Sequence, residues 1–264
     1  MTNGQRMANL KELWRDVASI LFPASCAVCQ RDDRVLCRAC ARRVQRRDYA
    51  ADIAVSAGAV PVVTVGEFTG DLKQLITAVK HYDQPQLARY LAPAVRTLLE
   101  HVCEQSLDLK QRSGAVLVPV PSRRRREHER GYRHLHEILR AAGVPRPRVR
   151  RVLRAGSGRT TQVGLDARER VHNAGRLRIH KRSLARVRSA GAPVIVFDDV
   201  TTTGASVGAA VAQLRAHGCD VVAAAAICRV QRNSLALSSA VPENLSKVKV
   251  RRAPMAPTAG ATAF

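Results

Sequence analysis

The clearest pattern of apolar and polar positions lies between residues 191 and 228. Four apolar residues at 194–197 follow Gly-Ala-Pro and are typical of a strand buried on both faces of a parallel sheet. From 206 to 217 the apolar positions recur at helical spacing, and Gly218 follows as a C-terminal cap. A second apolar run comes next, at 221–228. The pattern predicts a strand–loop–helix–strand unit whose loop lies where open α/β sheets bind ligands.

Similar patterns predict further elements on the N-terminal side of this unit. Apolar runs predict strands near 62–68 and 115–120. Helical spacing predicts helices over 10–21, 71–79 and 85–103, and a further helix that ends at Ala142. Polar residues 80–83 predict a loop in which Lys80 is solvated, with approach to a phosphate as the alternative for Lys80. The Ala- and Gly-rich stretch 48–60 predicts a linker. Together these elements predict an α/β fold with a parallel sheet flanked by helices.

The same patterns divide the chain into four parts. Within the basic, glycine-punctuated stretch 145–193, the segment from Arg159 through Leu165 to Asn173 predicts a mobile loop or hood over the site, with local disorder as the alternative. Residues after 232 are rich in Ser, Ala and Pro, which is typical of a disordered tail. We therefore expect an N-terminal helix (1–22), a cysteine-rich module (23–50), an α/β domain (60–232) and a tail (233–264).

Two Cys-x-x-Cys pairs stand close together in the cysteine-rich module: Cys26 with Cys29, and Cys37 with Cys40. In a chain without a secretion signal, this spacing fits tetrahedral Zn²⁺ held by four thiolates. A disulfide framework is disfavoured in a reducing compartment, and a redox role would need only one pair. Four thiolates leave no open coordination position, so we expect the zinc to be structural and to stabilise a segment with little core of its own.

The loop after residues 194–197 carries groups that suit a phosphorylated sugar. Asp198 and Asp199 can accept hydrogen bonds from vicinal hydroxyls, or hold Mg²⁺ through water. Small hydroxyl residues and Gly204 then let backbone N–H groups close around an anion at a helix N-terminus. A phosphate beside a diol describes a ribose 5-phosphate. The alternative is a plain strand–turn–helix with surface acids, although neither Asp-Asp nor Thr-Thr-Gly is typical of a simple turn.

Composition adds a strong positive charge to this picture. The formal net charge is +23, and residues 121–190 hold 21 of the 44 Lys and Arg but only 5 acidic residues. This density predicts polyanionic partners, although arginine as a generally favoured surface residue is the alternative. No apolar run is long enough to span a membrane and no signal-peptide pattern is present, so we expect a cytoplasmic protein without membrane insertion.

Two further groups of residues are candidates for ligand contacts. An arginine-rich loop follows the apolar run at 115–120, and Ser122, Arg123, Arg124 and Arg130 are placed to hold a diphosphate by bidentate contacts. Nucleic-acid backbone is the competing partner for such a loop. In the hood, Arg159, Gln162 and Arg170 are the residues that we expect to reach the site when it closes.

Together these motifs resemble the signature of type I phosphoribosyltransferases and, over about residues 18–230, the ComF family of competence-associated bacterial proteins. The resemblance is carried by Leu-Phe-Pro before the paired cysteines, Phe-Thr-Gly at 68–70 with Lys80, Val-Pro-Val-Pro at 118–121, Arg-Gly-Tyr at 130–132, Gln162 with Leu165, Arg170 and Asn173, and the Asp-Asp-x-Thr-Thr-Gly loop. Thr201 departs from the family pattern, where an aliphatic residue is usual, as does Arg133, where Asn is frequent.

The resemblance implies a phosphoribosyltransferase-like domain with an N-terminal zinc module and phosphoribosyl pyrophosphate (PRPP) with Mg²⁺ as ligand. The 5-phosphate would lie on the loop formed by Thr201, Thr202, Thr203, Gly204, Ala205 and Ser206, and the diphosphate on the loop from Ser122 to Arg130. Asp198 and Asp199 would hold the ribose and stabilise the positive charge that forms on the sugar when pyrophosphate leaves. No residue is a convincing general base, so the acceptor stays open.

A second hypothesis is a non-catalytic, PRPP-sensing protein that binds single-stranded DNA through its zinc module and arginine surface. The scarcity of aromatic residues, 3% of the chain, speaks against it because single-strand platforms stack bases on aromatic rings. A zinc-ribbon transcription factor with PRPP as effector is a third hypothesis.

Overall fold

The computed structural model describes residues 25–32, 34–57, 60–81, 84–121, 133–155 and 177–230. The predicted N-terminal helix, the arginine-rich loop, the predicted hood and the predicted tail lie outside these ranges. With them lie the candidate residues Ser122, Arg123, Arg124, Arg130, Arg159, Gln162 and Arg170. The described elements, in chain order, are α2 (Arg38–Gln45), β1 (Asp52–Ala57), β2 (Val60–Thr64), α3 (Gly70–His81), η1 (Pro85–Leu87), α4 (Ala88–Ser106), α5 (Leu109–Gly114), β3 (Val116–Pro119), α7 (His134–Ala141), η2 (Arg146–Arg148), β4 (Leu153–Ala155), β5 (Leu177–Ile179), α9 (Lys181–Ser189), β6 (Val194–Thr201), α10 (Ala205–Ala216) and β7 (Val221–Arg229).

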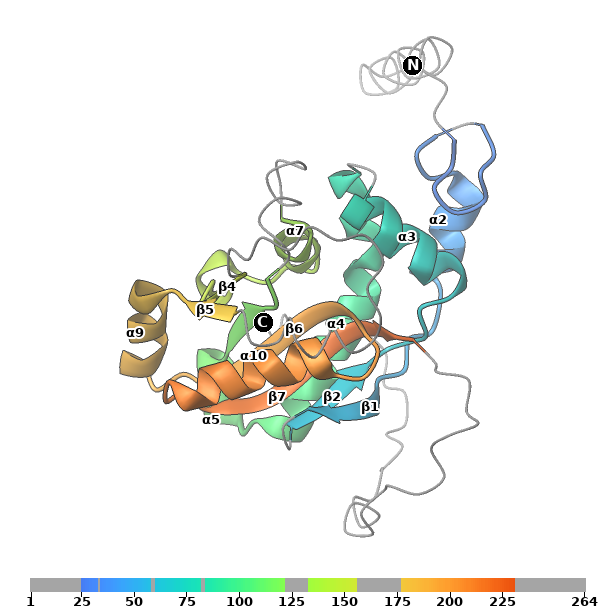
Figure 1. Cartoon of the computed structure of the whole chain (residues 1–264). Coiled ribbons are helices and arrows are strands. Elements are labelled where there is room, and N and C mark those ends of the chain that lie inside the picture. The colour runs from blue at the N-terminus through green and yellow to red at the C-terminus, as the bar shows by residue number, and fades with distance from the viewer. Residues whose placement is uncertain are drawn as a thin grey trace, which may run out of the picture.

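A five-stranded sheet in the order β1-β2-β7-β6-β3 forms the centre of the molecule (Figure 1). Strands β2, β7, β6 and β3 are parallel, and β1 pairs with β2 in the antiparallel direction at one edge. The apolar runs that predicted buried strands become β3, β6 and β7, with Val196 paired to Val118 on one side and to Ala224 on the other. The predicted α/β class with a mostly parallel central sheet is confirmed.

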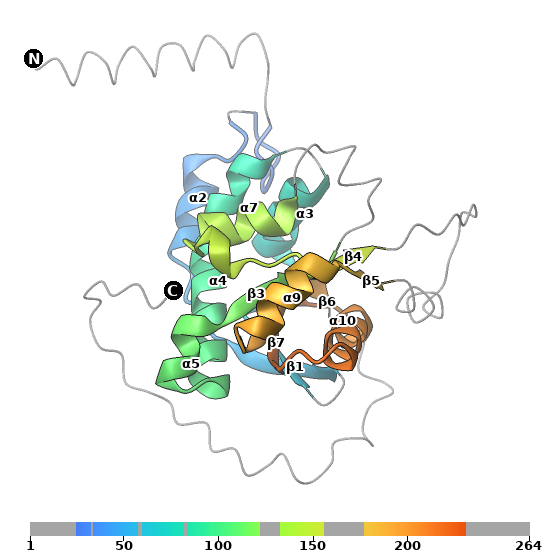
Figure 2. The same ribbon diagram turned by 90° about the vertical axis from the view of Figure 1, so that its left-hand side faces the viewer.

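Helices cover both faces of the sheet (Figures 1 and 2). On one face, Ile195 and Phe197 pack into a core cluster with residues of α2, α3, α4 and α7. On the other face, Val194 and Val196 pack with residues of α9 and α10. Because side chains alternate along a strand, successive residues of β6 point to these two different layers. This alternation decides where the two acids near the end of β6 point.

The longest helix, α4, forms the base of the larger layer. Its buried residues follow the helical period, as in Leu91, Val95, Leu98 and Val102, while its other face is polar. Pro93 is accommodated within the first two turns of the helix. Within the part of the chain that the structure describes, no helix combines the length and the apolar character needed to cross a membrane.

The cysteine-rich module shares the core of the α/β domain. Helix α2 packs against α3 and α4, and Cys40 and Val44 on its inner face belong to the same core cluster as Leu72 of α3. Figure 1 shows α2 beside α3 at one end of the molecule. The module therefore packs on the main core, and a metal ion that stabilised the module would also stabilise the position of α3.

Two local predictions are wrong, each for a packing reason. Residues 52–57, predicted as part of a linker, form the edge strand β1, whose Ala57 packs beneath α10. Lys80 and His81, predicted as part of a loop, belong to helix α3. On either side of the predicted hood, β4 and β5 pair in the antiparallel direction, and α9 follows β5. Single buried residues such as Leu184 and Val187 are enough to anchor α9 in this otherwise basic stretch.

Candidate functional site

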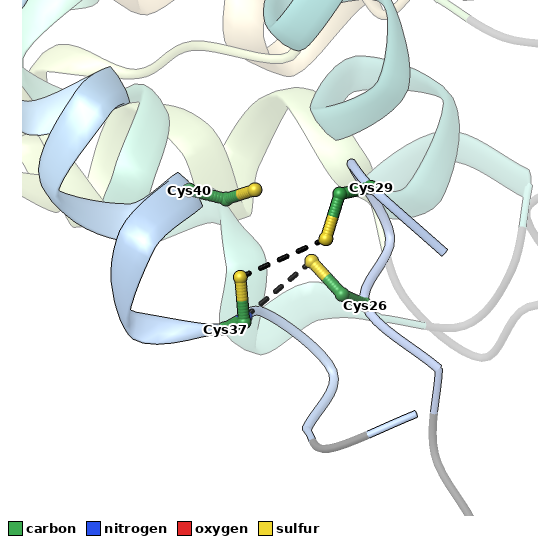
Figure 3. A group of neighbouring side chains, drawn as sticks. All are labelled: Cys26, Cys29, Cys37 and Cys40. Carbon is green, nitrogen blue, oxygen red and sulfur yellow. Dashed lines mark hydrogen bonds between the residues drawn. The ribbon is translucent and has the colours of Figure 1, made fainter. Parts of the chain in front are cut away.

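The four cysteines of the paired motifs come together at the edge of the larger helical layer (Figure 3). The sulfur atoms of Cys26, Cys29, Cys37 and Cys40 all lie within 4.8 Å of one another. The Sγ atoms of Cys29 and Cys37 are 3.8 Å apart. Four thiolates at about 2.3 Å from one tetrahedral ion have sulfurs about 3.8 Å apart, so the cluster has the dimensions of a metal site. It can hold a structural metal ion such as zinc.

Local backbone structure brings the cysteines into this arrangement. Gln30 has a positive φ of 62°, which turns the chain after Cys29, and its N–H donates to the carbonyl of Cys26 at 2.9 Å. Cys37 is the N-cap residue of α2, and Cys40 lies one turn further along the helix. The N–H of Cys37 also donates to Sγ of Cys26 at 3.4 Å. One tight turn and one helix start therefore place all four sulfurs around a common point.

The polar groups around the cluster favour thiolate at one cysteine in particular. Burial raises the pKa of Cys26, but hydrogen bonds from backbone N–H groups of Cys29, Cys37 and Val28 outweigh it and lower the pKa to about 6. Burial and contact with the other three sulfurs raise the pKa of Cys40 to about 12. The cluster thus presents one sulfur that ionises readily, and a cation would favour the ionised form of the others.

The second candidate site lies at the carboxyl end of β6, where Asp198 and Asp199 are the fifth and sixth residues of the strand. We expected the strand to stop before them, but β6 continues to Thr201 and keeps pairing with β7. Asp199 lies on the side of α3 and α7, and strand alternation predicts that Asp198 lies on the α10 side of the sheet. The two acids occupy different environments rather than one shared face.

Asp199 is buried and lies against a lysine and a histidine. Its Oδ2 lies 2.6 Å from Nζ of Lys80, near the end of α3, and 3.2 Å from Nε2 of His134, the first residue of α7. Its Oδ1 accepts a hydrogen bond from the N–H of Val200. Neither approach to Oδ2 has hydrogen-bond alignment, and no other donor within the described ranges replaces them. The carboxylate is held mainly by charge.

The two acids also differ in protonation. Burial raises the pKa of the Asp199 carboxyl, but the contact with His134 and the charge of Lys80 outweigh burial, so this pKa lies well below its ordinary value. Burial and then the negative charge of Asp199 raise the pKa of Asp198 well above its ordinary value, and Lys80 opposes the shift only in part. Asp199 is therefore a permanent anion, whereas Asp198 takes up a proton more readily.

The loop between β6 and α10 has the conformation that an anion-binding turn needs. Gly204, the N-cap residue of α10, has a positive φ of 74°. A side chain there would also be crowded, because a Cβ atom would lie 3.2 Å from Cγ2 of Val55 in β1. Glycine is thus required for two independent reasons, one conformational and one steric.

The residues predicted to hold a phosphate differ in exposure. Thr203 and Ser206 are exposed and Thr202 and Ala205 are half-buried, so their polar groups face outward at the start of α10. Thr201 is only 3% exposed and belongs to β6, which makes it a packing residue. Among the described residues, no side chain caps the N-terminus of α10.

The contact of two residues with Asp199 is not among the predictions from the sequence. The sequence predicts no role for His134, and it favours a solvated Lys80 over one that approaches a phosphate. Both lie on apolar helical stripes, Lys80 four residues after Ile76 and His134 four residues before Ile138. That spacing predicts an inward position for both side chains.

A third feature is the basic surface, which we define as β4, β5, α9 and the residues that join them within 146–155 and 177–193. These residues include ten Lys and Arg and no acidic residue. Burial and then the charges of Arg154, Arg151, Arg182 and Arg186 lower the pKa of His180, which precedes α9. The arginines are therefore close enough to act on one group together.

Comparison with known proteins adds no assignment. A scan of the chain against protein-family models gives no match, and a search of curated proteins finds none that matches either. Function is therefore inferred from the geometry of the sites themselves.

Proposed function

We propose that the protein binds PRPP at the carboxyl end of β6 and transfers its phosphoribosyl group to an acceptor, with release of pyrophosphate. The observation that carries this proposal is the arrangement at the start of α10. A half-buried carboxylate, Asp198, precedes a turn with exposed hydroxyls at Thr203 and Ser206, and Gly204 opens a helix for whose first N–H groups the described residues supply no side-chain cap. We call the turn at residues 202–206 the cradle. A carboxylate beside this cradle suits a sugar hydroxyl beside a phosphate.

The chemistry follows from where charge develops. When the bond between the sugar and the diphosphate breaks, positive charge forms on the sugar, and the carboxylate of Asp198 stabilises it across a short distance. The raised pKa of Asp198 means that sugar hydroxyls bind best once its carboxyl has lost its proton. Mg²⁺ bound with the diphosphate would supply neutralisation of the leaving group's charge.

The test is a calorimetric titration of PRPP with Mg²⁺ into the full-length protein. Asp198→Asn should weaken binding about tenfold or more, because it removes a charged acceptor from the sugar. Asp220→Asn is the matched control, since Asp220 is exposed and lies just before β7. Absence of PRPP binding by the wild-type protein would refute the proposal. Pyrophosphate release in the presence of individual bases and nucleotides would then identify the acceptor.

We propose Zn²⁺ as the ion of the cysteine cluster. Four sulfur donors from two Cys-x-x-Cys pairs are typical of structural zinc sites, and their spacing in space matches one tetrahedral ion. Metal analysis of the purified protein should find one zinc per chain.

The basic surface supports a second candidate function, the binding of single-stranded DNA. Ten cationic residues without an acidic neighbour favour a polyanion, and several of them on α9 are exposed, including Arg182 and Arg186. DNA affinity should fall steeply with salt. The double variant Arg182→Gln/Arg186→Gln should reduce the salt slope by about 2, whereas Arg42→Gln, an exposed arginine on α2, should leave it unchanged. An unchanged slope in the double variant would exclude this surface.

A further inference from the structure

A cluster of three ionisable groups lies behind the proposed cradle, on the opposite face of β6. Lys80 from α3, His134 from α7 and Asp199 from β6 meet at one carboxylate oxygen, with Nζ at 2.6 Å and Nε2 at 3.2 Å. The side chains of His134 and Asp199 are 5% and 3% exposed. Three elements that are distant in sequence therefore converge on one buried anion.

This geometry excludes Asp199 from direct contact with a sugar in the cradle. Its carboxylate points to the α3 and α7 side, whereas the turn that begins α10 lies on the other side of the strand. Both of its oxygens already have protein neighbours, Val200 on one and Lys80 and His134 on the other. Of the two neighbouring acids, this leaves Asp198 as the candidate for contact with the sugar.

Lys80 differs from its two neighbours in being accessible. Its side chain is 27% exposed, although its ammonium group touches a buried carboxylate. An ammonium group has three N–H donors, and one carboxylate oxygen occupies at most one of them. The others can meet an anion that approaches from solvent. A lysine fixed by a buried counter-ion also loses little additional conformational entropy on binding a ligand.

We infer that Lys80 is the cationic contact for the diphosphate end of the ligand, and that Asp199 and His134 are positioning residues that hold it there. This inference rests on the proposed function, because it assigns one end of the same ligand. The cradle at the start of α10 and the Lys80 ammonium lie on opposite sides of the end of β6. A molecule that reaches both needs an anionic group at each end of a sugar, which PRPP has and ribose 5-phosphate lacks.

The test compares these two ligands, because each probes a different part of the site. Calorimetry on the full-length protein measures the affinity for PRPP with Mg²⁺ and, separately, for ribose 5-phosphate. Lys80→Met should weaken PRPP binding about tenfold or more and leave ribose 5-phosphate affinity within about twofold. Lys73→Met on the exposed side of the same helix is the matched control and should change neither affinity.

Two further variants keep the test decisive if Lys80→Met folds poorly. Lys80→Arg keeps the charge and should retain most of the preference for PRPP over ribose 5-phosphate. Asp199→Asn frees Lys80 and should reduce that preference without abolishing ribose 5-phosphate binding. Equal PRPP affinity in wild type and Lys80→Met, or equal losses for both ligands, overturns the inference while leaving the proposed function standing. Failure of the wild-type protein to bind PRPP removes both.

Discussion

The cysteine cluster and the turn before α10 differ in the direction in which their polar groups point. In the cluster, four sulfurs point toward one another and three of the cysteines, Cys26, Cys37 and Cys40, are buried in the main core. At the turn, hydroxyls and backbone N–H groups point outward and, within the described ranges, have no side-chain cap. The first set of groups can be completed by an ion, and under the proposed function the second is completed by a ligand.

This difference separates groups that stabilise the fold from groups that serve function. A closed donor set leaves no position for a substrate, so its contribution is to the free energy of folding. An open set of donors contributes little to stability and leaves its hydrogen-bonding capacity for a ligand. By this criterion Asp198 belongs to the open set, and its neighbour Asp199, paired inside the protein, belongs to the closed one.

The largest effect is expected from breaking the cysteine cluster. Cys40→Ser removes one of four ligands from a buried position and should abolish stoichiometric metal binding, because serine is a poor ligand for zinc. Structural zinc sites contribute on the order of 10 kcal/mol to the folding of small modules, so the module should unfold locally. Metal content and the exchange of amide protons in α2 and α3 would measure both consequences.

Cys103→Ser is the matched control, since Cys103 is a buried cysteine of α4 outside the cluster. Its zinc content should equal that of the wild type, with only a modest loss of stability from placing a hydroxyl in an apolar site. Full zinc occupancy in Cys40→Ser would contradict the description of the cluster as a closed four-sulfur site.

A smaller effect is expected from uncoupling the buried ion pair. Asp199→Asn leaves the Lys80 ammonium without its counter-ion and should cost about 3 kcal/mol, at the lower end for buried pairs because Lys80 is partly exposed. Adding Lys80→Met should recover part of this loss, because the unpaired charge is then removed as well. Urea denaturation of both variants would measure the two free energies, and Asp220→Asn at the surface should change stability by less than about 0.5 kcal/mol. No recovery in the double variant would show that charge pairing is not what holds Asp199.

The elements of the sheet could be predicted from the sequence because burial on both faces leaves an unbroken apolar run. Strands β3, β6 and β7 follow this rule, and α10 follows from helical spacing. The edge strand β1 could not be predicted, because its small and polar residues depend on pairing with β2 and on contact with α10. Such tertiary contacts outweigh local propensity and have no local sequence pattern.

The candidate site shows the same division. The two cysteine pairs and the Asp-Asp-x-Thr-Thr-Gly loop could be identified because their spacing along the chain is itself the chemical pattern. The cluster of Lys80, His134 and Asp199 could not, because its members come from three elements and meet only after the sheet and helices pack. The opposite orientation of Asp198 and Asp199 depended on the strand continuing to Thr201, which its polar residues concealed.

A glycine comparison tests whether the open turn is shaped by conformation alone. Gly204 and Gly191 both have positive φ, 74° and 56°, but only Gly204 has a neighbour within contact distance of an added Cβ. Gly191→Ala should therefore cost about 1 kcal/mol from backbone strain, and Gly204→Ala about 2 kcal/mol from strain plus contact with Val55. Urea denaturation measures both costs, and only Gly204→Ala should also weaken ligand binding. Equal costs would show that β1 gives way and does not constrain the turn.

The smallest effect is expected at Arg43, where the closed cluster meets the surface. Arg43 donates to both carboxylate oxygens of Asp71 at 2.6 and 2.9 Å and also contacts Sγ of Cys40 at 3.4 Å. Its hydrogen bond and charge hold the pKa of Asp71 below its ordinary value, so at neutral pH the pair is ionised and stabilising. Because the Arg43 side chain is 55% exposed, Arg43→Gln should cost only about 0.5 kcal/mol, and the cost should shrink as salt is added.

Arg42→Gln, at an exposed neighbouring position on α2, controls for the loss of one positive charge and should change stability less than Arg43→Gln does. Zinc content should be the same in both variants, because four sulfurs complete the metal site without help from the surface. Loss of zinc in Arg43→Gln alone would mean that the thiolates need an external cation to balance their charge. The cluster would then be open on one side, and the contrast with the turn before α10 would be one of degree.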